Sequence, residues 1–167
     1  QVGLSRTGRL WAHEWNGVTP DLMTLAKPLA GGLPMGATLM TARVAEAIEA
    51  GDHGSTFGGG PLVAGVALAV CGHIADPDFL AGVRAAGALV RARLDRIVAA
   101  GRAREVRGLG LLWALDLGRP AADVVARALA AGLLVCTAGA DVVRIAPPLT
   151  VTVEELENGL DLLEESL

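Results

Sequence analysis

Lysine occurs once in this sequence, at position 27, where it could act as a nucleophilic amine. It directly follows the apolar run from Met23 to Ala26, so we expect its side chain to be partly buried at the end of that run. Burial lowers the pKa of an amine, and a neutral amine can form a Schiff base with a carbonyl group. Pro28 disfavours helix at Lys27 and predicts an extended backbone. The alternative is a solvated lysine at a strand end.

A second candidate site is the glycine-rich segment 55–60, which precedes a predicted helix. Ser55 and Thr56 supply hydroxyl groups, and Gly58, Gly59 and Gly60 leave their backbone N–H groups accessible. Hydroxyl and N–H groups ahead of a helix N-terminus are typical of an anion site, and phosphate is the obvious ligand. The alternative is a flexible linker with an ordinary helix cap.

The third candidate is Arg144, which lies in the short apolar stretch Val142 to Ala146 and is followed by two prolines. A guanidinium on so apolar a strand either points to solvent or pairs with a carboxylate in a bidentate way. Both interpretations stay open at this stage.

Other polar residues indicate no further site. His13 and His53 have no partners at metal-ligand spacing, so the sequence does not predict a metal centre. Residues 6–8, Arg-Thr-Gly, are predicted to form only a turn. The pair Gly108 and Gly110 lacks the rest of a dinucleotide-binding fingerprint.

The composition excludes several classes of protein. The chain has 167 residues, of which 52% are hydrophobic and 19% charged, and its net charge is -4. This composition excludes a disordered tail and a nucleic-acid binder of the basic-patch type. Cys71 and Cys136 are too few for a disulfide scaffold, and they suggest reduced thiols in a cytoplasmic protein. The longest apolar run, of about a dozen residues, is shorter than the roughly 20 that a membrane span needs.

Patterning divides the chain at Asp76-Pro77 into a piece of an α/β domain, residues 1–75, and a small α+β domain, residues 76–167. Periodicity, glycines and capping signals place the elements. In the first part these are a strand at Ala37–Met40, a helix at Thr41–Ala50 with Ala45, Ala47 and Ile48 inward, irregular structure at 51–60, and a helix from Pro61 that is buried on all sides. In the second they are an amphipathic helix at Asp78–Ala100, strands within Val106–Leu117, a helix at Ala121–Ala131, short strands at Leu133–Thr137 and Val142–Ala146, and a last helix opened by the capping box Thr152–Glu155.

Taken in order along the whole chain, these segments resemble the class-III pyridoxal-phosphate-dependent aminotransferases, in the subgroup of acetylornithine and ornithine aminotransferases. Each motif is weak alone, but the combination is specific. The motifs are Gln1-x-Gly3-x-x-Arg6-Thr7-Gly8, Gly17-Val18-x-Pro20-Asp21-x-x-Thr24-Leu25-Ala26-Lys27, Gly31-Gly32-x-Pro34-x-Gly36-Ala37, His53-Gly54-Ser55-Thr56-Phe57-Gly58-Gly59, Val106-Arg107-Gly108-x-Gly110-Leu111 and Arg144-x-x-Pro147-Pro148-Leu149.

The resemblance implies a fold and a set of roles. The fold is the C-terminal part of a fold-type I large domain followed by a small α+β domain. Lys27 would hold pyridoxal 5'-phosphate as a Schiff base and then move a proton, and Gln1 would hydrogen-bond the ring oxygen of the cofactor. Ser55 and Thr56 would bind the phosphate, Thr56 in the neighbouring subunit of a homodimer with shared active sites. Arg144 would clamp the substrate α-carboxylate.

The implied reaction moves an amino group from N-acetylornithine, or a related ω-amine of arginine or lysine biosynthesis, to 2-oxoglutarate. Alternatives are an ornithine or 4-aminobutyrate aminotransferase, a mutase or decarboxylase on the same scaffold, and a non-catalytic folding or dimerisation fragment. The segment Thr24 to Lys27 resembles the transaminases more than the aminomutases.

The sequence departs from the family pattern at Gly60, where asparagine is usual, and at Pro28, where a small residue is usual. The chain begins with Gln1 rather than Met. The resemblance implies that it is the C-terminal part of a chain of about 400 residues, and a start without Met agrees with this expectation. The aspartate that pairs with the pyridine nitrogen is expected upstream, so the fragment is expected to be inactive alone.

Overall fold

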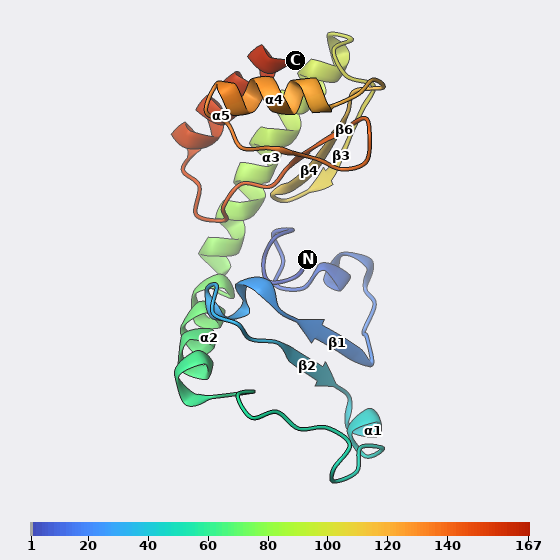
Figure 1. Ribbon diagram of the computed structural model, residues 1–167, viewed down its shortest axis with the longest axis vertical. Coiled ribbons are helices and arrows are strands. Elements are labelled where there is room, and N and C mark those ends of the chain that lie inside the picture. Colours follow the sequence, from blue (N-terminus) through green and yellow to red (C-terminus); the bar gives the residue numbers. More distant parts are fainter. Residues whose placement is uncertain (1) are drawn as a thin grey trace. The chain divides into compact units, whose positions relative to one another are not determined.

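The computed structural model describes residues 2–167, which divide into two compact units. The N-terminal unit contains residues 2–5 and Arg9–Leu80, and the C-terminal unit contains Arg6–Gly8 and Ala81–Leu167. The segment Arg6–Gly8 thus packs with the C-terminal unit, although the residues on both sides of it belong to the other unit. Helices and strands occur in both, which confirms the α/β fold class (Figure 1).

The N-terminal unit is built on an antiparallel strand pair and one long helix (Figure 1). Leu22 lies opposite Met40 and Leu25 opposite Ala37, so the pairing brings both ends of the connecting loop together. The elements are η1 (Ala12–Asn16), β1 (Leu22–Leu25), η2 (Lys27–Ala30), β2 (Ala37–Met40), α1 (Ala42–Ala45) and α2 (Pro61–Ile74). The predictions of a strand at Ala37–Met40 and irregular structure at 51–60 are confirmed.

The helix predicted over Thr41–Ala50 is much shorter than expected. Only Ala42–Ala45 is α-helical, and Ala45, Ala47 and Ile48 are exposed rather than inward. An isolated short helix is marginal in water unless an apolar face packs against a neighbour. Since these side chains bury nothing, one turn forms and the chain then leaves the helix.

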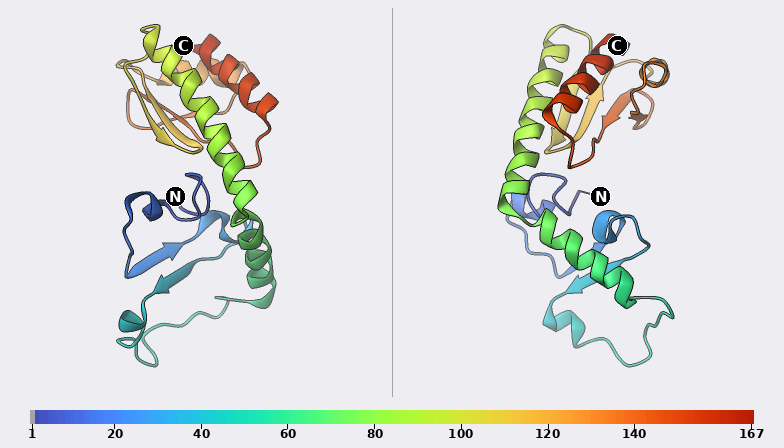
Figure 2. Two further views of the ribbon diagram at one scale, coloured as in Figure 1. Left: turned by 180° about the vertical axis from the view of Figure 1, so that it is seen from behind. Right: turned by 90° about the vertical axis from the view of Figure 1, so that its left-hand side faces the viewer.

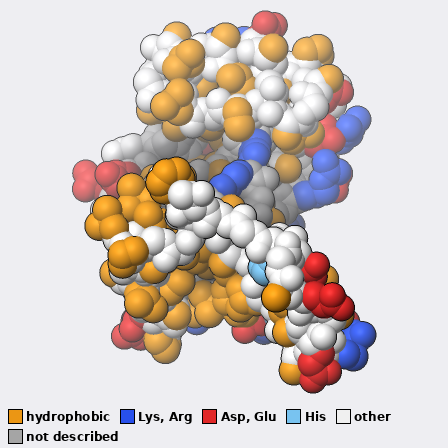
Figure 3. Space-filling view, turned by 60° about the horizontal axis from the view of Figure 1, so that its bottom comes forward, with side chains coloured by type: hydrophobic (Ala, Val, Ile, Leu, Met, Phe, Trp, Pro, Cys, Tyr) orange, Lys and Arg blue, Asp and Glu red, His pale blue; other side chains and the backbone are white. Residues whose placement is uncertain are grey.

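Helix α2 begins at Pro61 as predicted, but it is not buried on all sides. Only Ala67 and Ile74 are buried, and they pack in a core with Leu29 and Ala30 of η2. Apolar side chains on its other faces are exposed, among them Leu62 at 75% and Leu68 at 76%. Figure 3 shows hydrophobic side chains gathered on the face of this unit turned toward the viewer. Contiguous exposed apolar surface of this kind marks a contact surface.

A four-stranded antiparallel sheet in the order β3-β4-β6-β5 forms the centre of the C-terminal unit. β3 ends at Leu109, and the chain turns through Gly110 and Leu111 into β4. The predicted strand Leu133–Thr137 is reduced to two residues at the sheet edge. The strands are β3 (Glu105–Leu109), β4 (Leu112–Asp116), β5 (Cys136–Thr137) and β6 (Val142–Ile145).

Three helices contribute to this unit, and the first of them begins in the N-terminal unit: α3 (Pro77–Ala99), α4 (Ala122–Ala130) and α5 (Val153–Ser166). Helices α3 and α5 lie side by side (Figure 2), joined by ion pairs from Arg93 of α3 to Asp161 and Glu164 of α5. Arg102, which follows α3, also pairs with Glu164. The amphipathic helix predicted at Asp78–Ala100 is confirmed as α3, which buries an apolar stripe formed by Val83, Val90, Leu94 and Ile97. The capping box that opens α5 is confirmed as well. Buried side chains of α3, the sheet and α5 form the core: Val83, Val90, Leu94, Ile97, Leu111, Leu115, Val143, Leu156, Leu160 and Leu163.

Within residues 2–167, no single helix is both long and apolar enough to cross a membrane, and only α2 and α3 counted together across their break meet that requirement. The same residues contain no group of three or more His, Cys, Asp or Glu side chains placed to hold a metal ion.

Candidate active site

Lys27 adopts an unusual backbone conformation at the point where β1 runs into η2. Its φ is 49°, in the left-handed region, so the extended backbone predicted from Pro28 is wrong. The residue before a proline is kept out of the right-handed helical region, and here the chain takes the left-handed alternative. Burial of Leu29 and Ala30 anchors the following 3-10 turn and holds Lys27 in place. Such strain in a residue with a Cβ costs about 1–3 kcal/mol and is concentrated at active sites.

The side chain of Lys27 is exposed, so the burial expected from the preceding apolar run is not observed. Lys27 instead forms part of the wall of a pocket of about 240 Å³. That pocket is lined by Gly3, Leu4, Thr24, Leu25, Ala26, Lys27 and Pro28. A molecule bound in this pocket would therefore contact Lys27.

The backbone on the other side of this pocket is also strained and firmly held. Leu4 and Ser5 have φ values of 53° and 72°. The Ser5 hydroxyl is fully buried and donates a 2.6 Å hydrogen bond to the carbonyl oxygen of Ile74, the last residue of α2. Gln1, predicted to contact the cofactor, lies outside the described residues, but the chain that follows it is fixed against α2.

The predicted phosphate loop is an exposed turn that is stabilised by its own serine. The Gly58 N–H donates a 2.9 Å hydrogen bond to the Ser55 hydroxyl oxygen, and Gly59 has a φ of 69°. Ser55 and Thr56 are both exposed, and the Phe57 side chain is 91% exposed. Neither hydroxyl-bearing residue lines the pocket that contains Lys27. Both residues are therefore accessible from solvent and form no part of the wall of that pocket.

Arg144 lies in the middle of the sheet, on β6, where it is half-buried. Ala114 on β4 and Cys136 on β5 are its neighbours across the strands. Three residues further on, the Pro147 carbonyl accepts a 2.5 Å hydrogen bond from the guanidinium of Arg6. The turn predicted for residues 6–8 is observed, as turn at residues 6 and 7 and a bend at residue 8. No local pattern predicted the contact between Arg6 and Pro147, which are 141 positions apart.

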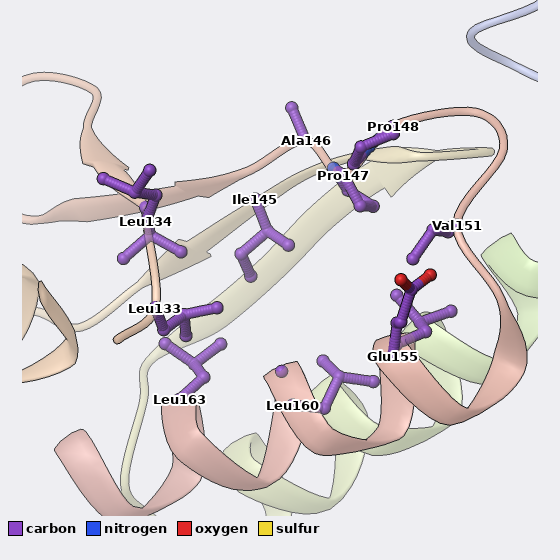
Figure 4. Close-up of a pocket in the computed structure, with 13 residues that line it drawn as sticks. Leu133, Leu134, Ile145, Ala146, Pro147, Pro148, Val151, Glu155, Leu160 and Leu163 are labelled. Carbon is purple, nitrogen blue, oxygen red and sulfur yellow. The ribbon is translucent and has the colours of Figure 1, made fainter. Parts of the chain in front are cut away.

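A larger pocket, of about 380 Å³, lies beside the end of β6 but does not suit anionic ligands (Figure 4). Its walls are mostly aliphatic, and Glu155 is the one charged residue that lines it. Hydrogen bonds from the backbone N–H and hydroxyl of Thr152 hold the pKa of the Glu155 carboxyl below its ordinary value. An ionised carboxylate disfavours a phosphate or carboxylate ligand, so we assign no chemistry to this pocket.

Comparison with known proteins identifies the family. The sequence model of the class-III aminotransferase family matches residues 1–167. The chain belongs to this family. The resemblance stated from the motifs is thereby confirmed, and class-III aminotransferases depend on pyridoxal phosphate.

Relatives of this class-III aminotransferase chain include the mitochondrial acetylornithine aminotransferase of Alnus glutinosa, which is 52% identical over the whole chain. The crystal structure of N-acetylornithine aminotransferase from Stenotrophomonas maltophilia has a TM-score of 0.87 at 37% identity and covers 99% of the chain. Ornithine aminotransferase from Toxoplasma gondii has a TM-score of 0.90 at 34% identity and covers 98%. The chain spans 38%, 44% and 40% of these proteins, respectively.

Proposed function

We propose that the protein transfers an amino group from N-acetylornithine to 2-oxoglutarate, with pyridoxal phosphate as cofactor, in arginine biosynthesis. The identity of 52% to a relative named acetylornithine aminotransferase supports this donor. The observation that carries the proposal is the environment of Lys27. The only lysine in the sequence stands in a strained left-handed conformation in the wall of a pocket of about 240 Å³.

The residues present fit the cofactor. Pyridoxal phosphate needs an amine for covalent attachment and hydrogen-bond donors for its phosphate, and this chain offers Lys27 for the first and Ser55 and Thr56 for the second. Gln1 is proposed to hydrogen-bond the ring oxygen. In domain terms, residues 1–75 are proposed to be the C-terminal portion of the cofactor-binding large domain and residues 76–167 the small domain.

The chain's own residues then have distinct tasks. When bound, the cofactor stabilises the negative charge that develops on the substrate carbon after a proton leaves it. The Nζ atom of Lys27 takes that proton as a general base and later returns one as a general acid, which requires the amine in its neutral form first. The strained backbone of Lys27 limits the positions that Nζ can reach. Arg144 is proposed to bind the α-carboxylate of the substrate through two parallel N–H donors.

Thr56 is proposed to serve the cofactor bound to a second copy of the chain, which makes the enzyme a homodimer with shared active sites. Two features support this assembly. The loop that carries Thr56 is exposed and contributes nothing to the lining of the pocket beside Lys27. Helix α2, directly after the loop, leaves Leu62 and Leu68 exposed, as a surface that pairs with another chain would. We propose the cytoplasm as the compartment.

Ornithine is the second candidate donor. The fold agrees with ornithine aminotransferase from Toxoplasma gondii at a TM-score of 0.90. Turnover of the full-length enzyme with N-acetylornithine, ornithine and 4-aminobutyrate separates the candidates. N-acetylornithine is expected to have the highest kcat/KM, and a higher value for either competitor would overturn the proposed donor.

The attachment site is tested by borohydride reduction of the full-length protein, which makes covalent attachment of the cofactor to a lysine permanent. Peptide mass analysis is expected to place the adduct on Lys27. Lys27→Arg is expected to lose the adduct and to lower activity by about 10²–10⁴-fold.

Arg43→Lys is the matched control, because it introduces a lysine at an exposed position in an ion pair with Asp21, while Lys27 remains. This variant is expected to carry the adduct on Lys27 and none on residue 43. An adduct on residue 43, or full activity of Lys27→Arg, would contradict the assignment.

A further inference from the structure

Arg6 connects two loops of the C-terminal unit. Its Nη1 atom donates to the carbonyl oxygen of Pro147 at 2.5 Å and to that of Leu111 at 3.1 Å. Pro147 follows the end of β6, the strand that carries Arg144, and Leu111 lies in the turn between β3 and β4. One guanidinium thus fixes the spacing between the end of β6 and the adjacent turn.

The backbone around Arg6 is held as closely as its side chain. The Arg6 carbonyl accepts a 3.0 Å hydrogen bond from the N–H of Leu111. A Cβ added to Gly110 would lie 2.5 Å from the same carbonyl oxygen, so the two backbone segments are in close contact. Arg84 of α3 donates a 2.7 Å hydrogen bond to the carbonyl of Gly8. Since guanidinium donors have a rigid fork geometry, Arg6 has little freedom at either end.

Arg6 and Arg144 are also close enough to interact electrostatically. Burial, and after it the charge of Arg144, hold the pKa of Arg6 below its ordinary value. Within residues 2–167, no ion pair joins Arg6 to a carboxylate. Like charges repel, so each guanidinium raises the energy of the other in its charged form. A carboxylate bound near both groups relieves this repulsion.

We propose that Arg6 is a positioning residue for substrate binding, which holds the end of β6 so that Arg144 presents its guanidinium to the α-carboxylate of the substrate. This inference rests on the proposed role of Arg144. It assigns a function to a residue that the sequence indicated only as part of a turn.

The test uses the full-length holoenzyme and two amino acceptors that differ only in the α-carboxylate. These are 2-oxoglutarate and succinic semialdehyde, which has a hydrogen atom in its place. Arg6→Gln is expected to raise KM for 2-oxoglutarate about tenfold, the size expected when a hydrogen bond to a charged group is lost. KM for succinic semialdehyde and kcat with both acceptors are expected to stay within about twofold.

Three further variants sharpen the result. Arg84→Gln removes an arginine-to-carbonyl hydrogen bond from the same segment without touching Pro147, so it is expected to leave the ratio of the two KM values unchanged. Arg6→Lys keeps the positive charge but loses the planar set of guanidinium donors, so it is expected to raise KM for 2-oxoglutarate as Arg6→Gln does. Arg6→Gln combined with Arg144→Gln is expected to raise KM no more than Arg144→Gln alone.

The outcomes separate this inference from the proposed function. If Arg144→Gln changes the KM ratio and Arg6→Gln does not, positioning by Arg6 is refuted while carboxylate binding by Arg144 stands. Equal increases in KM for both acceptors after Arg6→Gln would refute positioning as well, because a general structural defect does not select for the carboxylate. If Arg144→Gln leaves the ratio unchanged, the role of Arg144 fails, and this inference fails with it.

Discussion

Replacing Gly110 with alanine should destabilise the C-terminal unit in a way that can be worked out from the structure. Gly110 has a φ of 57°, in the region that residues with a Cβ rarely adopt. An added Cβ would lie 2.5 Å from the Arg6 carbonyl oxygen and 2.6 Å from the Thr7 carbonyl carbon and Cα. These are backbone atoms, so no rotation of a side chain can relieve the overlap.

The expected loss has two parts. A left-handed conformation costs a residue with a Cβ about 1–2 kcal/mol. Overpacking a closely packed site adds about 1–3 kcal/mol. Gly110→Ala is therefore expected to lower the free energy of unfolding by about 2–5 kcal/mol in total.

Gly139→Ala is the matched control for the packing part. Gly139 has a φ of 76°, but an added Cβ there would meet no atom within 4 Å. Gly139→Ala should therefore lower the free energy of unfolding only by the cost of the left-handed conformation, about 1–2 kcal/mol. Urea unfolding of the full-length protein, followed by circular dichroism, measures both variants. Equal losses in the two would refute the argument that Gly110 is required by the approach of residues 6 and 7.

Two further predictions concern stability. Thr152→Ala removes the hydroxyl that accepts a 3.2 Å hydrogen bond from the Glu155 N–H, so it should lower the free energy of unfolding in urea by about 1 kcal/mol. Thr150 is exposed, and Thr150→Ala should leave that free energy almost unchanged. Similar losses for both variants would show that the cap does not contribute. Hydrogen bonds from Arg104 and from the Gly118 N–H hold the pKa of Asp116 below its ordinary value, so its stabilisation is present above the unfolded-state pKa of about 4 and is lost as the pH falls through the folded-state value. Asp116→Asn should therefore lower the melting temperature at pH 7, and the difference in melting temperature from the unchanged protein should become smaller as the pH is lowered. A difference that stays constant with pH would contradict this.

Sequence patterns predicted best those elements whose signals are local. The apolar stripe of α3 and the capping box at Thr152 depend on residues three or four positions apart, and both appear in the structure. The strands predicted within Val106–Leu117 correspond to β3 and β4. The family, too, could be recognised from short motifs around Lys27 and Arg144.

Features that depend on distant contacts were not predictable. The apolar composition of α2 predicted burial on every side, but burial depends on what packs against a helix, and Leu68 remains exposed. Pro28 excluded a right-handed helical backbone at Lys27 without choosing between the extended and left-handed alternatives. Arg6 lies between short residues in a turn, and only its contacts with Leu111 and Pro147 distinguish it from an ordinary surface arginine.

The inclusion of residues 6–8 in the C-terminal unit has a consequence for biosynthesis. Arg6 precedes Pro147 by 141 positions. At about 5–20 residues per second, the ribosome adds Pro147 about 7–28 s after Arg6. Of its two carbonyl acceptors, Leu111 is synthesised first, 105 positions after Arg6, and Pro147 follows only when the end of β6 has been made. The contact between Arg6 and Pro147 can therefore form only after strands β3, β4, β5 and β6 have all been synthesised.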